Sequence, residues 1–387
     1  MAQIYLDNAA TAGYTPIDEI VVNTITKAMK NCWQNPSSLY ANDVKEEINR
    51  CRGQIARFIG AKPDEIIFTS GASESNNMAI RGWVDNEISD NFEKKYNNLI
   101  VITTPIEHKS IIKSVESEVL GAGAWYCNVD EFGLIDTNHL DKLLYYQLGK
   151  PILVSVGMAN NEIGTIQNIK EVSKLVHRYN GVLHVDATQA FGHIPINVEE
   201  LGIDMMSASG HKISPVLKGI GFLYKKNCIN IQPLIYGSQE YGLRGGTENT
   251  FGIIGLANAI KYCDTSQKNI DEMCKKRDYL IDSLKSKFNC KLNGHSEQRL
   301  PNNINITFPQ NITGEGLLYT LDISDIKIST GSACNSKEIA PSHVLKGIGL
   351  TDEEILKTIR ISLPSDIRYQ DIDDIINEID KSIRLIE

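Results

Sequence analysis

The chain has 387 residues, enough for one large or two medium domains with a sizeable core. Hydrophobic residues make up 42% and charged residues 22%, as in ordinary globular proteins, and the net charge of −9 argues against direct binding of nucleic acid. The chain starts without a basic stretch followed by an apolar run, and no apolar run reaches about 18 residues. We therefore expect a cytoplasmic protein without a signal peptide or a membrane span.

The cysteines are scattered, and none forms a C-x-x-C pair. This pattern predicts reduced thiols that mostly serve packing, rather than the disulfide framework of a small secreted protein. The eight positions are Cys32, Cys51, Cys127, Cys228, Cys263, Cys274, Cys290 and Cys334.

Strand-like runs alternate with helical patterns through the first 255 residues. Val44, Ile48, Cys51, Ile55 and Phe58 form one apolar helix face. The strand-like runs are Glu65–Thr69, Asn98–Thr103, Ile152–Val156, Val182–Asp186, Met205–Ser209 and Ile220–Tyr224. The alternation predicts an α/β fold with a largely parallel sheet wrapped by helices.

The pattern changes after about residue 255. A helical segment runs through Ile270–Leu284, short strands follow at Ile304–Phe308 and Ile326–Ser329, and helices at Asp352–Ile359 and Asp371–Ile386 end the chain. We therefore expect a large domain over residues 15–255 and a smaller α+β domain made of residues 1–14 and 256–387.

Asp186 and Lys212 each close an apolar, strand-like run. Ligands of a parallel sheet lie beyond the carboxyl ends of its strands, which is where both residues fall. A lysine can form a Schiff base with an aldehyde, and an aspartate can keep a pyridinium nitrogen protonated. The pair therefore points to pyridoxal phosphate.

The run Thr69–Asn77 follows a strand and opens a helix. Gly71 permits a tight turn and Ser73 offers a hydroxyl, so the helix start suits a phosphate. An ordinary capped helix start is the alternative, and the nearby Asp186 and Lys212 favour the phosphate site.

Four further polar positions follow strands or lie in loops. His108, after a strand, can stack on an aromatic cofactor and move protons, or can simply cap a turn. Asn161 and Gln189 are strand-end amides that can bind a ring oxygen or a carboxylate. Thr247 lies in the Gly-rich loop Arg244–Asn249, which suits anion contact in the same subunit or across an interface, or is a surface turn.

Two positions near the C-terminus are candidates for the chemistry. Cys334 is flanked by small polar residues, so it is a better nucleophile candidate than the other cysteines, although an ordinary exposed thiol remains the alternative. Arg360 sits in an apolar run, where it can clamp a substrate carboxylate or form a structural salt bridge.

With these residues in view, the chain resembles the class V aminotransferase family, and within it the cysteine desulfurases of the NifS/IscS type. The similarity runs from Tyr5–Thr11 to Thr358–Ser362. It implies a fold-type-I, aspartate-aminotransferase-like homodimer with a mostly parallel seven-stranded sheet and bound pyridoxal 5'-phosphate.

The resemblance also implies a role for each candidate residue. Lys212 is the Schiff-base lysine, Asp186 faces the pyridine nitrogen, His108 stacks on the ring, and Gln189 approaches its phenolic oxygen. Ala72, Ser73, Ser209 and His211 bind the phosphate, with Thr247 from the other subunit; Asn161 and Arg360 hold the substrate carboxylate; and Cys334 receives the sulfur. No resident metal is implied, although Cys334 is a possible iron–sulfur ligand during transfer.

Three segments depart from the family pattern. Ser73 replaces the usual threonine and keeps the hydroxyl. The turn Ile213–Gly219 after Lys212 is one residue longer than usual and lacks the first glycine of a Gly-Pro-Lys-Gly sequence. Leu363–Asp366 lacks the usual glycine and arginine, and the C-terminus is short for the branch whose tail docks a scaffold protein.

We therefore expect an enzyme that converts L-cysteine to L-alanine and a Cys334 persulfide. The destination of the sulfur stays open: an iron–sulfur scaffold protein, a tRNA-thiolating enzyme, or the synthesis of a thiamine-type cofactor. Alternative functions are a selenocysteine lyase, a class V aminotransferase, and a sulfur carrier without catalytic activity that has kept the fold.

Overall fold

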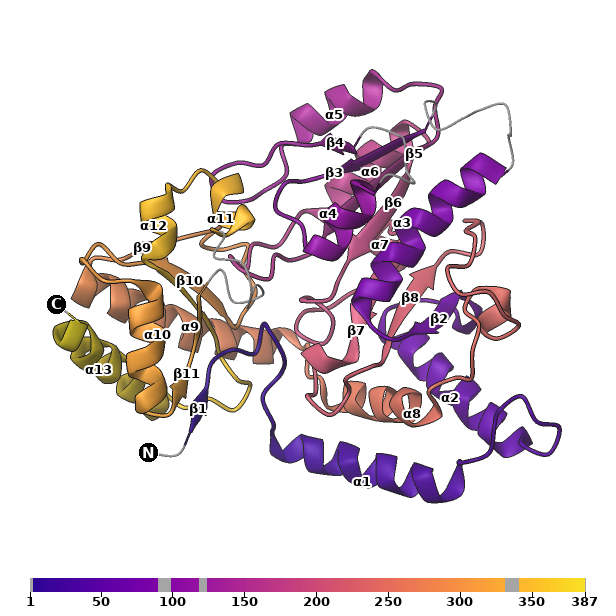
Figure 1. The fold of residues 1–387 in the computed structure, drawn as a ribbon, viewed down its shortest axis with the longest axis horizontal. Coiled ribbons are helices and arrows are strands. Elements are labelled where there is room, and N and C mark those ends of the chain that lie inside the picture. The colour runs from indigo at the N-terminus through magenta and orange to yellow at the C-terminus, as the bar shows by residue number, and fades with distance from the viewer. Residues whose placement is uncertain (1–2, 90–98, 118–123, 331–340, 387) are drawn as a thin grey trace.

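The computed structural model describes residues 3–89, 99–117, 124–330 and 341–386. A seven-stranded sheet forms its larger part (Figure 1). In spatial order its strands are β2 (Ile66–Thr69), β8 (Gly221–Lys225), β7 (Met205–Ser209), β6 (Val182–Asp186), β5 (Ile152–Gly157), β3 (Ile100–Thr103) and β4 (Ala124–Tyr126). The four pairs from β7 to β4 are parallel, whereas β8 is antiparallel to both of its neighbours. The predicted α/β class and mostly parallel sheet are confirmed.

Helices cover both faces of this sheet. They are α1 (Pro16–Asn31), α2 (Asn42–Phe58), α3 (Ala72–Ser89), α4 (Lys109–Val115), α5 (Thr137–Tyr145), α6 (Ile169–Arg178), α7 (Val198–Leu201) and α8 (Thr250–Ala259). Along β5, Ile152 and Val154 face the core that contains α2, α5, α6 and α8, while Leu153 faces the core of α3 and α4. Strands that are buried on both faces are continuously apolar, which is why they could be predicted from the sequence as apolar runs.

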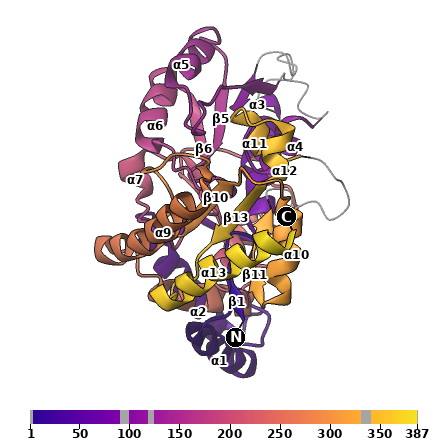
Figure 2. The same cartoon turned by 90° about the vertical axis from the view of Figure 1, so that its left-hand side faces the viewer.

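A second unit lies beside the sheet, at the left of Figure 1. Its strands form the order β12 (Ser329–Thr330), β13 (Thr358–Ser362), β10 (Asn303–Thr307) and β9 (Lys291–Leu292), and β1 (Ile4–Tyr5) pairs with β11 (Ile326–Lys327). Its helices are α9 (Gln267–Phe288), α10 (Gly314–Ile323), α11 (His343–Gly347), α12 (Asp352–Leu356) and α13 (Tyr369–Ile386). Figure 2 shows α9, α10 and α13 around β10 and β13.

The two units have separate apolar cores. Val21 and Ile260 pack in a core of the large sheet, whereas Leu6 and Leu280 pack in the core of the second unit. We therefore propose the predicted division into two domains, with the second boundary just after Ile260 rather than at residue 255, because α8 and Ile260 pack with the large sheet.

One predicted helix is too long. Helix α12 ends at Leu356, and the predicted helical residues Thr358 and Ile359 belong to β13 instead. The reason is tertiary, because β13 pairs with both β10 and β12. None of the helices in the described part of the chain combines the length and apolar character that a membrane crossing requires.

Candidate active site

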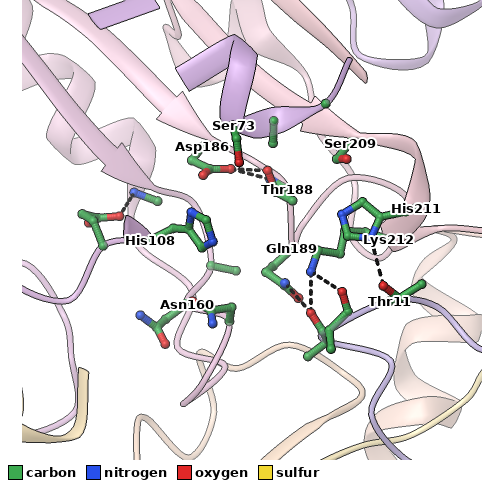
Figure 3. Close-up of a pocket in the computed structure, with 18 of the residues that line it drawn as sticks. Thr11, Ser73, His108, Asn160, Asp186, Thr188, Gln189, Ser209, His211 and Lys212 are labelled. Carbon is green, nitrogen blue, oxygen red and sulfur yellow. Dashed lines mark hydrogen bonds between the residues drawn. The ribbon is translucent and has the colours of Figure 1, made fainter. Parts of the chain in front are cut away.

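Six strands of the large sheet point the same way, so their carboxyl ends meet at one edge. A cavity of about 560 Å³ lies there (Figure 3). Most of the predicted site residues line it: Ala72, Ser73, His108, Asn161, Asp186, Gln189, Ser209, His211, Lys212 and Arg360. Thr247 is exposed and lies outside this lining. Cys334 lies outside the described residues.

Lys212 ends the short 3₁₀ turn that follows β7. Its Nζ donates hydrogen bonds to the backbone oxygens of Ala9, at 2.7 Å, and Ala10, at 2.8 Å. The Nε2 of Gln189 donates to the same Ala9 oxygen at 2.9 Å, as the convergence of the two side chains in Figure 3 shows. The N-terminal segment therefore crosses the cavity and positions two predicted cofactor residues.

The long turn after Lys212 is an ordered part of the fold. Ser214 donates from its backbone nitrogen to Gly210 and from its hydroxyl to the buried Asp18 carboxylate. Leu217 is 1% exposed and packs into the main core. The extra residue is thus absorbed without displacing Lys212 from the cavity.

Asp186 is held at the end of β6 by three donors. The backbone N–H of Thr188 lies 2.9 Å from Oδ1, which the Thr188 hydroxyl also contacts. The Nδ2 of Asn76 donates to Oδ2 at 2.8 Å. These donors fix the orientation of the carboxylate, which is 8% exposed and faces the cavity.

His108 is joined to Asp186 through a hydrogen-bond chain. Asn76 also donates from Nδ2 to the Ser110 hydroxyl at 2.9 Å, and that hydroxyl lies 2.8 Å from Nδ1 of His108. The Ser110 backbone N–H donates to the same Nδ1 at 3.1 Å, which places the imidazole at the N-cap of α4. Desolvation by the surrounding protein lowers the pKa of His108, and because Nδ1 accepts the Ser110 N–H, the neutral form of the ring carries its proton on Nε2.

The opposite end of the cavity is suited to an anion. Helix α3 begins at Ala72, directly after β2 and the Ser70–Gly71 turn. Gly221 is the first residue of β8, and a Cβ there would lie only 2.6 Å from the Gly71 Cα. The absence of a side chain at Gly221 therefore lets the Ser70–Gly71 turn pack against β8. The α3 N-terminus, Ser73 and Ser209 therefore bring hydrogen-bond donors to one place.

His211 lies beside this donor group. Burial, together with the nearby Lys212 and Lys218, lowers its pKa to about 4, so the ring is neutral. Its Nδ1 lies 3.1 Å from the Thr11 hydroxyl. When Nδ1 accepts that hydroxyl proton, Nε2 is left as a donor.

Arg360 lies on β13 and is 2% exposed. Its guanidinium donates to the Asp7 carboxylate at 2.6 Å and to the Asn161 backbone oxygen at 3.2 Å. Its buried Nε has no hydrogen-bond partner among the described residues. Since a guanidinium carries five N–H donors, Arg360 retains capacity for another anion.

The sequence interpretation gave no role to several residues that shape this cavity. They are Asp7, Thr11, Asn76, Glu107, Ser110, Glu162 and Thr188. Burial raises the pKa of Glu107 to about 7 and that of Glu162 to about 7. Asp7, Asn76 and Glu162 stand in motifs that the sequence displays, but only the tertiary contacts reveal their partners. In the described part of the chain, no three His, Cys, Asp or Glu side chains form a metal-binding group.

The sequence matches the family model for aminotransferase class V over residues 4–375. It is 40% identical to "Cysteine desulfurase IscS" of Dictyoglomus turgidum over 99% of this chain and 96% of that protein. A solved "NIFS-LIKE PROTEIN" superposes with a TM-score of 0.88 at 31% identity, covering 99% of this chain and 100% of that one. A solved "SspA in complex with cysteine" has a TM-score of 0.80 at 32% identity, covering 94% and 99%. The chain therefore belongs to the aminotransferase class-V family, in the branch of the NifS- and IscS-type cysteine desulfurases.

Proposed function

We propose that this chain is a pyridoxal-phosphate-dependent cysteine desulfurase. The observation that carries the proposal is one cavity in which Lys212, Asp186 and a helix N-terminus come together at the strand ends. The balanced reaction is L-cysteine plus the Cys334 thiol giving L-alanine plus a Cys334 persulfide. The substrate Cβ–S bond breaks, an S–S bond forms, and the carbon takes up the proton, so no external oxidant or reductant is required.

The side chains of the cavity fit this cofactor. Ala72, Ser73, Ser209 and His211 would hold the phosphate, since the α3 N-terminus and the two hydroxyls supply donors. Asp186 would hold the ring nitrogen protonated. Asn161 and Gln189 would contact ring substituents, and His108 would lie against the ring. Pyridoxal phosphate, when bound, supplies the electron sink that makes the substrate bonds labile.

Lys212 has two functions in this proposal. Its amine would attach the cofactor and then carry the proton that leaves the substrate Cα. When Lys212 is not bonded to the cofactor, its Nζ would bond to the Ala9 and Ala10 carbonyls, as it does in this structure. A neutral His108, with a proton on Nε2, would exchange a proton with the substrate in this cavity.

The stoichiometry of the reaction tests the proposal. Purified protein loaded with pyridoxal phosphate and given L-cysteine should form alanine and persulfide sulfur in equal amounts. Chromatography of alanine and trapping of sulfide with a reductant present measure the two products. Amino-group transfer to a keto acid without sulfide would instead support an aminotransferase, and turnover of selenocysteine with none of cysteine would support a selenocysteine lyase. Failure to bind the cofactor would favour a sulfur carrier without catalytic activity.

Arg360→Gln should lower kcat/KM for L-cysteine by a factor on the order of 10 to 100. The reason is the loss of charged hydrogen bonds to the substrate carboxylate, which are worth about 1.5–3 kcal/mol. Most of the loss should appear in KM, because the carboxylate does not change during the reaction. Steady-state kinetics with L-cysteine methyl ester is the control. The ester lacks the negative charge and should lose less, so an equal loss for both substrates would argue that Arg360 is only a structural partner of Asp7.

We also propose that the enzyme is a homodimer. Large apolar side chains are exposed on the α1–α2 connection and on the loop after β8, and such patches mark protein–protein interfaces. They include Trp33, Leu39, Tyr40, Tyr236 and Tyr241, which range from 60% to 91% exposed. A second copy seated there would bury them and bring its Thr247 toward the phosphate end of the cavity.

The loop that carries Thr247 is tied to the phosphate end of its own subunit. Glu240 pairs with the buried Arg52 at 2.7 Å and accepts the Phe68 backbone N–H of β2 at 2.8 Å. Arg244 pairs with Glu74, in the first turn of α3, at 2.9 Å. These two ion pairs hold the loop against β2, the edge strand of the sheet. They therefore fix the position of Thr247, which supports its proposed role as a phosphate ligand.

Leu39→Glu combined with Tyr236→Glu should shift the protein from dimer to monomer, because each carboxylate would be buried without a partner. Sedimentation velocity with pyridoxal phosphate present measures the change. The matched control is Tyr145→Glu combined with Tyr146→Glu, on exposed tyrosines at the far end of α5. A dimer that survives the first pair of substitutions would place the interface elsewhere.

The persulfide sulfur is proposed to pass to a second protein, either an iron–sulfur scaffold protein or a tRNA-thiolating enzyme. Iron would enter as cargo of that reaction. Co-purification of the chain with one or the other acceptor, under conditions that preserve the persulfide, decides between them.

A further inference from the structure

Helix α11 begins at His343, nine positions after Cys334 in the chain (343 − 334), and its N-cap is Ser342. This helix belongs to the second unit by sequence, but it packs on two loops of the large sheet. The first loop contains Ile106, Glu107 and His108, and the second is the Asn160–Gly164 turn that contains Asn161. Both loops line the candidate active site.

The apolar part of this contact is a small core of its own. Val344 and Leu345 from α11, and Ile348 at its C-cap, pack with Ile106 and Ile163 from the two loops. The contact is close, since a Cβ on Gly347 would lie 2.6 Å from the Ile106 side chain. The start of α11 is therefore fixed relative to the cavity by packing.

The polar part of the contact is a buried carboxyl. The Ser342 hydroxyl donates to Oε2 of Glu162 at 2.5 Å, and it also accepts the Leu345 backbone N–H at 3.2 Å as the helix cap. Glu162 is 6% exposed and Ser342 is 4% exposed. A second bond joins Nε2 of His343 to the Glu107 backbone oxygen at 2.9 Å.

The same Asn160–Gly164 turn is joined to the substrate end of the cavity. Asn160 accepts the backbone N–H of Glu162 at 2.9 Å and donates to the Ile106 oxygen at 2.9 Å. Arg360 donates to the backbone oxygen of Asn161, the residue before Glu162. One turn thus contacts the proposed carboxylate clamp with its backbone and the start of α11 with its side chain.

A carboxyl at this position is costly. Burial is the main reason that the pKa of Glu162 rises to about 7, and an apolar residue of similar size would avoid that desolvation. The bond to Ser342 offsets only part of the cost. A role beyond stability explains why such a group stands between the proposed substrate clamp and α11.

We propose that Glu162 is a positioning residue for sulfur transfer: through Ser342 it sets the point from which the chain leads back to Cys334, relative to the bound substrate. The inference rests on the proposed desulfurase function. It assigns to Glu162 no contact with substrate or cofactor. It places the effect of Glu162 on the formation of the S–S bond, after cofactor and substrate have bound.

Glu162→Ala and Ser342→Ala should each slow persulfide formation by about 10- to 100-fold, the loss expected from a small misplacement of reacting groups. The affinity for pyridoxal phosphate and the KM for cysteine should stay unchanged. Single-turnover trapping of the persulfide on Cys334, followed by mass spectrometry, measures the step. Because both variants break the same bond, the double variant should be no slower than either single one. Glu162→Gln can still accept the Ser342 hydrogen bond and should restore most of the rate.

Thr351→Ala is the matched control. Thr351 caps α12 with the same kind of side-chain bond, at 3.2 Å to the Glu354 N–H, but it is exposed, and the hydrogen bonds of its side chain run to Glu354 of the same helix. This variant should keep the wild-type rate. Hydrogen exchange supplies a readout that does not depend on turnover: the amides of residues 343–348 should exchange faster in Glu162→Ala than in the wild type or Thr351→Ala.

Two results would overturn the inference. One is a Glu162→Ala enzyme with wild-type persulfide formation and wild-type exchange in α11. The other is a parallel loss of cofactor binding and persulfide formation, which would make Glu162 part of the cofactor site. If the wild-type protein forms no alanine from cysteine, the proposed function fails instead, and the exchange experiment still reports whether Glu162 fixes α11.

Discussion

Lys212→Ala should lower alanine formation from L-cysteine by at least about 10³-fold, because it removes both the covalent attachment of the cofactor and the group that moves the substrate proton. The fold should survive. The lost contacts include two hydrogen bonds from the half-buried Nζ to the Ala9 and Ala10 carbonyls, worth about 1 kcal/mol each. Borohydride reduction followed by mass spectrometry should detect pyridoxal phosphate on the wild-type chain and none on the variant.

Two variants separate the chemistry of Lys212 from its charge. Lys212→Arg keeps a cation that can bond to the same carbonyls, yet it cannot form a Schiff base, so it should be as inactive as the alanine variant. Lys218→Ala removes the other lysine that lines the cavity and should retain most of the activity. If Lys212→Arg turned over within tenfold of the wild type, the assignment of the Schiff base to Lys212 would be wrong.

The sequence predicted the part of the site at the strand ends because the pattern that marks it lies within short stretches of the chain. Strands such as β6 and β7 are buried on both faces, so they read as apolar runs, and the polar residues that end them stand out. In a parallel sheet those ends meet at one edge, which is how Asp186 and Lys212 reach the same cavity. The alternation of strand and helix patterns, which implies parallel strands, and the polar residues after those strands were sufficient for this prediction.

The rest of the site depends on contacts between distant segments. Ala9 lies 203 positions from Lys212, and it takes part through its backbone carbonyl, which no side-chain motif displays. In the sequence, Asp7 is a single acidic residue near the N-terminus, and only the folded chain brings the Arg360 guanidinium to 2.6 Å from its carboxylate. Residues Thr358 and Ile359 continued a helical pattern, but pairing with β10 and β12 made them a strand. Glu162 likewise acquires its partner Ser342 only in the folded chain.

The environments of the described cysteines narrow the choice of the enzyme thiol that first receives the substrate sulfur. Burial raises the pKa of Cys51, Cys127, Cys263 and Cys290 to about 12 each, and it also raises that of Cys32 and Cys274. These thiols stay protonated near neutral pH and are poor nucleophiles. Cys228 is exposed, but it follows β8, whose carboxyl end lies at the sheet edge opposite the cavity because β8 is antiparallel to β7. We therefore keep Cys334 as the proposed acceptor, in preference to the described cysteines.

Cys334→Ala should abolish persulfide on the enzyme and lower alanine formation by about 10²- to 10⁴-fold, the range expected when a nucleophile is removed. Pyridoxal phosphate should still bind, since none of the cavity donors is changed. The measurements are the mass of the chain after a single turnover, which should show one added sulfur in the wild type alone, and the absorbance of the bound cofactor. Cys228→Ala is the matched control and should behave as the wild type, because its thiol lies at the wrong edge of the sheet. Undiminished sulfide release by Cys334→Ala would transfer the role of acceptor to another thiol, and Cys228→Ala would then show whether the exposed cysteine had taken it.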